Sequence, residues 1–307
     1  MTSQTSVKDF LKVKLWGVRG ELPASPNPFE GVSNFKNFFT DFFNAGFSSL
    51  PEVDSFIATH NKSHWGGYSV NTTCVEVTSA KAQLIIEGGS GLKSLGDSML
   101  KGPAGKGQGM VHLFISDFEW ENLIGLPFFT PIFIPNNEIH FYSISKEIET
   151  NIKSIFSKPY FPVDFKHLMS KISFHCISPG ETLLFEDLEI KPLLSSNQNE
   201  SHCNYKIINK TTNKSYIHNS SPYSLDLKEL LQLQNCDLMY SSLNQSDIEI
   251  LISEAEVRNV QKLLLGKYKM DQTTSVIEKI DSELKNKFTT NNKKIWSFAL
   301  QDQEIEL

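Results

Sequence analysis

The distribution of hydrophobic and polar residues predicts short strands separated by helices. Residues 11–16 (L-K-V-K-L-W) alternate as a half-buried strand does, and residues 71–77 and 83–87 form further apolar runs. Similar runs predict strands at 111–115, 139–144, 172–177, 182–185, 188–194, 204–209, 214–219, 237–240 and 294–300. Helices are expected at 146–156, 257–265 and 274–284. Two strand-rich halves with helices between them predict an α/β fold, a four-layer αββα sandwich, as a single domain over residues 1–307.

A proline- and phenylalanine-rich insertion at about residues 21–66 interrupts this pattern. Phenylalanine recurs at helical spacing over residues 35–47 (F-K-N-F-F-T-D-F-F-N-A-G-F). This spacing predicts a helix whose apolar face packs as core, forms a lid, or remains exposed for a partner.

Two glycine-rich stretches are expected to lie outside helices and strands. Residues 88–91 (G-G-S-G) follow a predicted strand but lack the lysine and Ser/Thr of a phosphate-binding loop, so we expect a tight turn. Residues 101–109 (K-G-P-A-G-K-G-Q-G) are expected to form a flexible surface loop.

The composition is that of a globular protein and excludes some partners. The chain has 307 residues, 39% of them hydrophobic and 21% charged, with a net charge of -6. This charge argues against bulk nucleic-acid binding and against an acidic membrane surface. No signal-peptide pattern and no apolar stretch of membrane-spanning length occurs, and the four cysteines are widely spaced. We therefore expect a cytoplasmic protein without disulfides.

Residues 116–127, S-D-F-E-W-E-N-L-I-G-L-P, follow the apolar run V-H-L-F-I and are expected to lead into a helix. The segment resembles the metal-binding loop S-H-x-H-x-D-H of the metallo-β-lactamase fold family. Other matching segments are L-W-G-V-R-G-E-L-P (15–23), N-T-T-C-V-E-V (71–77), L-I-I-E-G-G-S-G-L (84–92) and G-L-P-F-F-T-P-I-F-I-P (125–135). The chain is similar to a bacterial subgroup near ribonuclease Z and related phosphodiesterases, whose members bind two divalent metals.

The resemblance assigns nine site positions, none of which keeps the residue of the family. In the loop, the three histidine positions hold Asp117, Glu119 and Asn122, and the aspartate position holds Glu121. The remaining metal-ligand positions correspond to Gln198, Asn219 and Ala299, and the positions of the helper histidine and its acidic partner correspond to Gln272 and Ser241.

These substitutions remove the imidazole ligands that a catalytic zinc site needs. The resemblance therefore implies a catalytically inactive, pseudoenzyme-like protein without a cofactor, which serves as a binding or regulatory module. The expected ligand is a nucleotide, a phosphodiester or a protein partner, because the similar enzymes act on phosphodiesters. The resemblance also implies a homodimer, or pairing with an active paralogue.

Three alternatives are compatible with the same residues. Asp117, Glu119 and Glu121 suit a hard cation, Mg²⁺ or Mn²⁺, and would then serve a metal-dependent phosphodiesterase. Without a cation, crowded carboxylates should raise a pKa or attract Lys267 or Lys269. A second alternative is a relocated metal site built from His202, His218 and Glu121, and a third is a purely structural or assembly protein.

Overall fold

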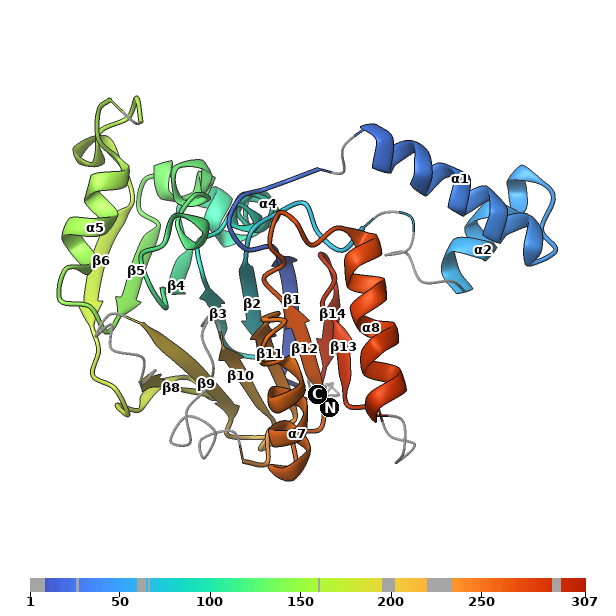
Figure 1. The fold of residues 1–307 in the computed structure, drawn as a ribbon. Helices are drawn as coiled ribbons and strands as arrows, with labels where there is room; N and C mark the ends of the chain where they lie inside the picture. Colours follow the sequence, from blue (N-terminus) through green and yellow to red (C-terminus); the bar gives the residue numbers. More distant parts are fainter. Residues whose placement is uncertain are drawn as a thin grey trace, which may run out of the picture.

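Two seven-stranded sheets lie face to face in the computed structural model (Figure 1). The structure describes residues 9–25, 28–59, 65, 67–159, 161–194, 202–219, 234–288 and 294–307. Among the helices in these ranges, none is both long and apolar enough to cross a membrane.

The first sheet has the order β14-β1-β2-β3-β4-β5-β6. Its strands are β14 (Glu304–Glu306), β1 (Lys12–Gly17), β2 (Cys74–Thr78), β3 (Gln83–Ile86), β4 (Met110–Phe114), β5 (Glu138–Ser143) and β6 (Lys171–Cys176). Strands β3 to β6 pair in parallel, whereas β14, β1, β2 and β3 pair antiparallel.

The second sheet has the order β13-β12-β11-β10-β9-β8-β7. Its strands are β13 (Trp296–Phe298), β12 (Leu263–Gly266), β11 (Leu238–Ser242), β10 (Ser215–Asn219), β9 (Cys203–Asn209), β8 (Leu188–Leu194) and β7 (Leu183–Phe185). Strands β10 to β13 are parallel, and the predicted 204–209/214–219 hairpin is present as the antiparallel pair β9 and β10.

Helices cover the outer face of each sheet. Side chains of α4 (Gly91–Met99) and α5 (Ile148–Ile155) pack in one hydrophobic core with residues of β3, β4 and β5. A second core fills the space between the sheets and continues to α7 (Ile248–Val257) and α8 (Thr274–Phe288). The predicted four-layer αββα sandwich is therefore confirmed.

The insertion forms an arm, defined here as residues 28–59, that projects from one side of the sandwich (Figure 1). It contains α1 (Pro28–Asn44), the 3₁₀ turn Leu50–Glu52 and α2 (Val53–Thr59). The Phe-rich helix predicted at 35–47 is thus part of α1. The arm points away from the strand ends, so it does not lie over them as a lid in this structure.

Residues 257–265 do not form the predicted helix. Helix α7 ends at Val257, and residues 263–266 form β12, a central parallel strand that is buried on both faces. Such a strand is a continuous apolar run, which periodicity alone does not distinguish from a short buried helix.

Other sequence-based expectations also need correction. The glycine-rich turn at 88–91 continues directly into α4, and the segment 101–109 contains the 3₁₀ turn Pro103–Lys106 with Ala104 buried. The loop after β4 leads into three 3₁₀ turns, Trp120–Asn122, Leu126–Phe128 and Thr130–Phe133, rather than an α-helix. Prolines at the starts of the latter two turns fit these short segments. Strand β14 was not predicted.

Candidate functional site

The candidate site lies where strands of both sheets end. Glu87 follows β3, and Asp117 lies shortly after β4 in the first sheet. In the second sheet, Asn219 ends β10, Ser241 lies near the end of β11, and Lys267 follows β12. Because parallel strands end at the same edge of a sheet, this topology brings side chains from distant parts of the chain together.

Glycines hold the loop after β4 close to the turn after β3. The amide of Gly88 donates to the carbonyl of Asn122 at 2.7 Å, and the amide of Gly125 donates to the carbonyl of Gly88 at 2.8 Å. A Cβ atom on Gly125 would lie only 2.0 Å from the carbonyl oxygen of Gly89. The G-G and G-L-P segments therefore fix the loop by backbone contact that side chains would prevent.

Asp117 is buried and saturated with hydrogen bonds inside this loop. Its Oδ1 accepts from the amide of Glu119 and from Nδ2 of Asn122, both at 2.8 Å, and its Oδ2 lies 2.9 Å from Nδ1 of His202. Burial opposes ionisation, but the His202 hydrogen bond and the Lys267 charge outweigh it and hold the pKa of Asp117 well below its usual value. Both oxygens of the Asp117 carboxylate are therefore already hydrogen-bonded to groups of the same chain.

Lys267 places a positive charge among the carboxylates. Its Nζ lies 2.7 Å from Oε1 of Glu121, and the residue is only 5% exposed. Burial lowers the pKa of Lys267, but Glu121, Asp117 and Glu87 together raise it above the usual value. The lysine therefore stays charged. This pairing confirms the expectation that crowded carboxylates attract Lys267.

Glu87 is the most deeply buried acid at the site, and sequence reasoning missed it. It is fully buried, and burial followed by the negative charge of Asp117 raises its pKa to about 8. Its Oε2 accepts from the amide of Ser116 at 3.4 Å, and its Oε1 lies 3.7 Å from Nε2 of His218. At neutral pH this carboxyl group is mostly protonated. The available sequence signal was an acidic residue at the end of an apolar strand, L-I-I-E.

Two of these ionisable residues have unusual backbone conformations. Glu87 has φ 67° and Lys267 has φ 54°, in the left-handed region that side chains other than glycine rarely adopt. Each such residue costs on the order of 1 kcal/mol. Strained residues of this kind concentrate at functional sites, which supports a site at this edge.

Four buried polar atoms near Lys267 have no hydrogen-bond partner among the residues the structure describes. They are Oε1 of Glu87, Oδ1 of Asn122, Nε2 of His202 and Nε2 of His218. Burial and the Lys267 charge lower the pKa of His218 to about 3, so its imidazole is neutral at neutral pH. An unpaired buried polar atom costs about 1–3 kcal/mol, so the folded chain bears this cost at the strand ends around Lys267.

The other positions assigned from the resemblance lie in three places. Asn219 and Ser241 are joined by a hydrogen bond of 2.9 Å from Nδ2 to Oγ. Gln272 is buried, and its side-chain oxygen accepts a hydrogen bond from the amide of Lys269 at 2.9 Å. Ala299 is buried directly after β13, and its amide donates to the carbonyl of Leu265. Gln198 lies outside the described residues.

The described residues do not fit the two-metal centre of the fold family. They contain no group of three or more His, Cys, Asp or Glu side chains that could hold a metal ion. Glu121 is paired with Lys267, and Asp117 is held by His202 and Asn122. The hard-cation set of Asp117, Glu119 and Glu121 is therefore not assembled, and neither is the relocated set of His202, His218 and Glu121. A buried ammonium group would also repel a divalent cation.

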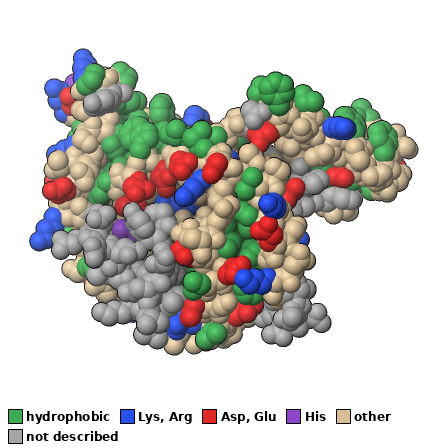
Figure 2. Space-filling view, viewed as in Figure 1, with side chains coloured by type: hydrophobic (Ala, Val, Ile, Leu, Met, Phe, Trp, Pro, Cys, Tyr) green, Lys and Arg blue, Asp and Glu red, His purple; other side chains and the backbone are tan. Residues whose placement is uncertain are grey.

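An apolar groove borders the loop on the side of α5. It has a volume of about 600 Å³ and is lined mainly by Phe118, Trp120, Leu123 and Ile155. Figure 2 shows a row of acidic side chains beside a hydrophobic patch along this edge of the sandwich. Burial followed by the charge of Asp117 raises the pKa of Glu119 above its usual value. The groove is therefore an apolar surface next to a charged edge.

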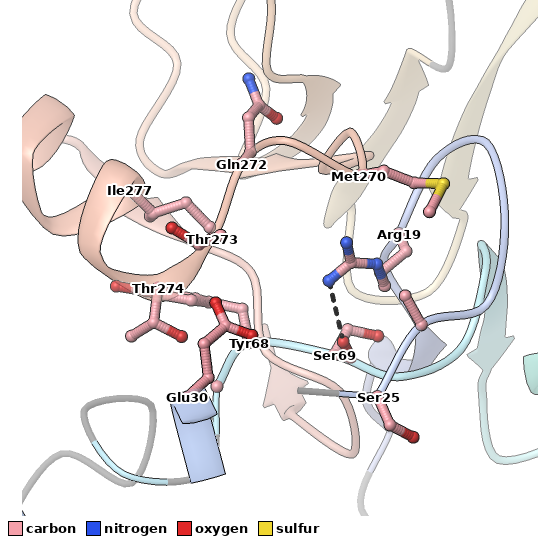
Figure 3. Close-up of a pocket in the computed structure, with 12 residues that line it drawn as sticks. Arg19, Ser25, Glu30, Tyr68, Ser69, Met270, Gln272, Thr273, Thr274 and Ile277 are labelled. Carbon is pink, nitrogen blue, oxygen red and sulfur yellow. Dashed lines mark hydrogen bonds between the residues drawn. The ribbon is translucent and has the colours of Figure 1, made fainter. Parts of the chain in front are cut away.

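On the arm side, a cavity of about 190 Å³ lies between Arg19, Glu30, Ser69 and the start of α8 (Figure 3). Arg19 donates from Nη1 to the carbonyl of Ser69 at 3.4 Å. Burial lowers the pKa of Arg19, and the charge of Glu30 opposes this shift. The base of the arm is thus linked electrostatically to the sandwich.

Solved structures with the metallo-β-lactamase fold are similar to this chain along almost its whole length. The metallo-β-lactamase fold protein YhfI from Bacillus subtilis aligns with a TM-score of 0.61 and 15% identity, over 98% of this chain and 100% of its own. A diphosphatase from the PhnP family gives 0.58 and 11% identity, over 97% and 98%. The short form of human tRNase Z gives 0.55 and 9% identity, over 96% and 98%.

No protein-family model matches the sequence, and no curated protein sequence matches it significantly. The structural similarity therefore establishes the metallo-β-lactamase fold that the sequence motifs indicated. At these identities the similarity is one of fold, and function has to be argued from the site.

Proposed function

We propose that this chain is a non-hydrolytic binding protein with the metallo-β-lactamase fold, in which Lys267 provides the positive charge of the site and no metal cofactor is used. The observation that carries the proposal is the 2.7 Å contact between Nζ of Lys267 and Glu121 within the degenerate metal loop. The ammonium group neutralises the loop carboxylates that a cation would otherwise have to neutralise.

A lysine cannot replace the chemistry of the metals. Metal-dependent hydrolysis in this kind of site depends on a bound water whose pKa the metal lowers to near neutrality. An ammonium group carries a single charge, offers no coordination position for such a water, and is already hydrogen-bonded to Glu121. No contact among the described residues at this edge therefore favours a metal-dependent phosphodiesterase.

The groove at Phe118 and Trp120 is the binding surface that we propose. Trp120 is about half exposed and lies directly beside Glu119 and Glu121 in the chain. Among the ligand classes expected from the resemblance, a nucleotide fits best, because its base can stack on an exposed aromatic ring. Its phosphate would be repelled by the carboxylates, so base stacking rather than phosphate contact should dominate the affinity.

The first test combines metal content with activity. Purified protein is exposed to Zn²⁺, Mn²⁺ and Mg²⁺, desalted, and assayed for bound metal and for cleavage of bis(p-nitrophenyl) phosphate. We expect neither stoichiometric metal nor hydrolysis. One or two ions per chain that are lost in Glu121→Ala, together with hydrolysis, would overturn the proposal.

A matched variant tests the role of Lys267 itself. In Lys267→Ala the carboxylates lose their internal counter-charge, so millimolar Mn²⁺ should raise the melting temperature of this variant but not that of the wild type. Equal effects of Mn²⁺ on both proteins would show that Lys267 does not take the place of a cation.

The groove is tested by titration with adenosine, AMP and cyclic AMP, followed by tryptophan fluorescence and calorimetry. We expect Trp120→Ala to weaken binding at least tenfold, with the nucleoside bound at least as well as the nucleotides. Phe128→Ala is the control, since Phe128 is similarly exposed but does not line the groove. Equal losses in both variants, or binding of the nucleotides only, would contradict base stacking at Trp120.

A further inference from the structure

One face of α1 presents a stripe of exposed apolar side chains. Val32, Phe35, Phe39 and Phe43 are between 52% and 69% exposed. Spacings of three and four residues place them on one side of the helix. Scattered exposed apolar residues are ordinary, but an aligned stripe marks an interaction surface. Figure 2 also shows hydrophobic side chains exposed along the arm.

The stripe is not needed to hold the arm together. A neighbouring face of α1 packs against α2 through Phe38 and Phe42, whose rings lie 5.5 Å and 5.3 Å from that of Phe56. Phe42 also stacks on Phe47 at 5.6 Å. These rings form a small aromatic core within the arm. The stripe therefore faces outward from an element that already has its own packing.

We propose that the stripe is a homodimer interface in which α1 of one copy packs antiparallel against α1 of a second copy. The stripe is nearly self-complementary when read in the opposite direction. In an antiparallel pair centred near residue 37, Val32 lies opposite Phe43 of the second copy, and Phe35 lies opposite its Phe39. A two-fold interface requires such a surface, because each copy uses the same residues.

The position of the arm favours the antiparallel arrangement. Helix α1 begins close to the sandwich and runs outward (Figure 1). A parallel pair would bring both sandwiches to the same end of the helices, where they would have to be accommodated side by side. An antiparallel pair places them at opposite ends of a helix of 17 residues.

The size of the stripe is sufficient for a specific contact. Three half- to two-thirds-exposed Phe side chains and one Val from each copy would bury on the order of 1,000 Å² in total. This lies near the lower limit for a stable interface. Helix packing with interdigitated aromatic rings then adds to the affinity.

The charge of the arm argues against a membrane as the occupant. Residues 28–59 contain the acidic residues Glu30, Asp41, Glu52 and Asp54 but a single basic residue, Lys36. Helices that bind the surface of anionic bilayers carry an excess of Lys and Arg on their polar face. A second copy of the same chain needs no such excess.

The oligomeric state tests this inference independently of the proposed ligand. Sedimentation equilibrium of the full chain between 1 and 100 µM should give a dimer for the wild type and a monomer for Phe35→Glu/Phe39→Glu. Asn37→Glu adds charge to the other side of α1 and should remain dimeric. Circular dichroism melting checks that all three proteins are folded.

Cross-linking tests the antiparallel orientation. In a Cys176→Ser background, which removes the exposed native thiol, the double variant Val32→Cys/Phe43→Cys should form intermolecular disulfides under mild oxidation. Val32→Cys alone should not, because the two positions 32 would be roughly 16 Å apart along the helices.

A monomeric wild type, or a Phe35→Glu/Phe39→Glu variant that stays dimeric, would overturn the inference. Efficient cross-linking of the single variant would overturn the antiparallel arrangement. Sedimentation with phosphatidylglycerol vesicles is run in parallel. A monomer that binds these vesicles through the stripe would identify a membrane surface as the occupant instead.

Discussion

At the scale of single residues, the protonation states of Lys267 and Glu87 determine the electrostatics of the site. Lys267 is a buried cation bonded to Glu121, and Glu87 is a buried carboxyl group that is mostly protonated at neutral pH. Both arise because burial is combined with nearby charge. The stability of the folded chain should therefore respond to substitution and to pH at these two positions.

Removing the lysine should be strongly destabilising. Lys267→Met would leave Glu121 and Asp117 without their counter-charge, and loss of one partner of a buried ion pair costs about 3–5 kcal/mol. Urea denaturation measures this change. Adding Glu121→Gln in the Lys267→Met background should recover on the order of 1–3 kcal/mol through the coupling of the pair. Purely additive losses would mean that the two side chains do not interact.

Glu87 should make stability decrease as the pH rises. Its pKa is about 8 in the folded chain, against 4.5 for an unperturbed glutamate. The folded state therefore holds an extra proton between these values, and the stabilisation present below pH 4.5 is lost as the pH rises through 8. Glu87→Gln should remove this loss, so its melting temperature should exceed that of the wild type increasingly from pH 5 to pH 9. A constant difference over this range would contradict the buried-acid assignment.

At the scale of the elements, local pattern predicted most of the strands, including the buried β10 and β11, but not β12. The boundaries of β8 and the cores of β1, β3, β5 and α8 follow from local pattern. Helix α7 was not predicted, and the apolar run that contains β12 was assigned to a helix at 257–265. Only pairing with β11 and β13 decides that residues 263–266 are extended. Tertiary pairing of this kind cannot be read from a short window.

The end of α7 gives a direct test of this correction. Asn259 has φ 58°, and the amide of Val260 donates to the carbonyl of Ala255 at 2.9 Å, as in a left-handed helix C-terminus. Asn259→Ala should therefore be less stable than Asn259→Gly by about 1 kcal/mol, since both lose the side-chain hydrogen bonds and only alanine resists this φ. If residues 257–265 were helical, alanine would be the more stable of the two in urea denaturation.

The candidate site was predictable only in part, for a related reason. The loop residues Asp117, Glu121 and Asn122 could be located because they follow an apolar strand in a recognisable frame. The contacts that determine their chemistry come from elsewhere, since Lys267 lies 146 positions beyond Glu121 and His202 lies 85 beyond Asp117. Lys267 was suspected on charge grounds alone, and Glu87 was missed because burial, which raises its pKa, is a property of the assembled sandwich.

At the scale of the whole molecule, the sandwich and the arm are packed by separate sets of residues. The sandwich has two cores on either side of its first sheet, and neither contains a residue of the arm. The arm has its own aromatic core around Phe56. We therefore expect the sandwich to fold without the arm.

Replacement of residues 27–66 by a short Gly-Ser linker should leave a folded sandwich. The amide of Ala24 donates to the carbonyl of Val70 at 3.0 Å, so the two ends of the insertion are already adjacent. We expect a cooperative thermal transition within a few degrees of the wild type and a monomer in sedimentation. An insoluble or non-cooperative product would show that the arm is required for the fold.

The same hydrogen bond between Ala24 and Val70 has a consequence for how such a chain can change over evolutionary time. An insertion whose two ends are adjacent can be gained, lost or replaced as a unit without altering the register of any strand. The arm surface and the site at the strand ends could then evolve independently, because mutations in the insertion leave the strand ends unchanged.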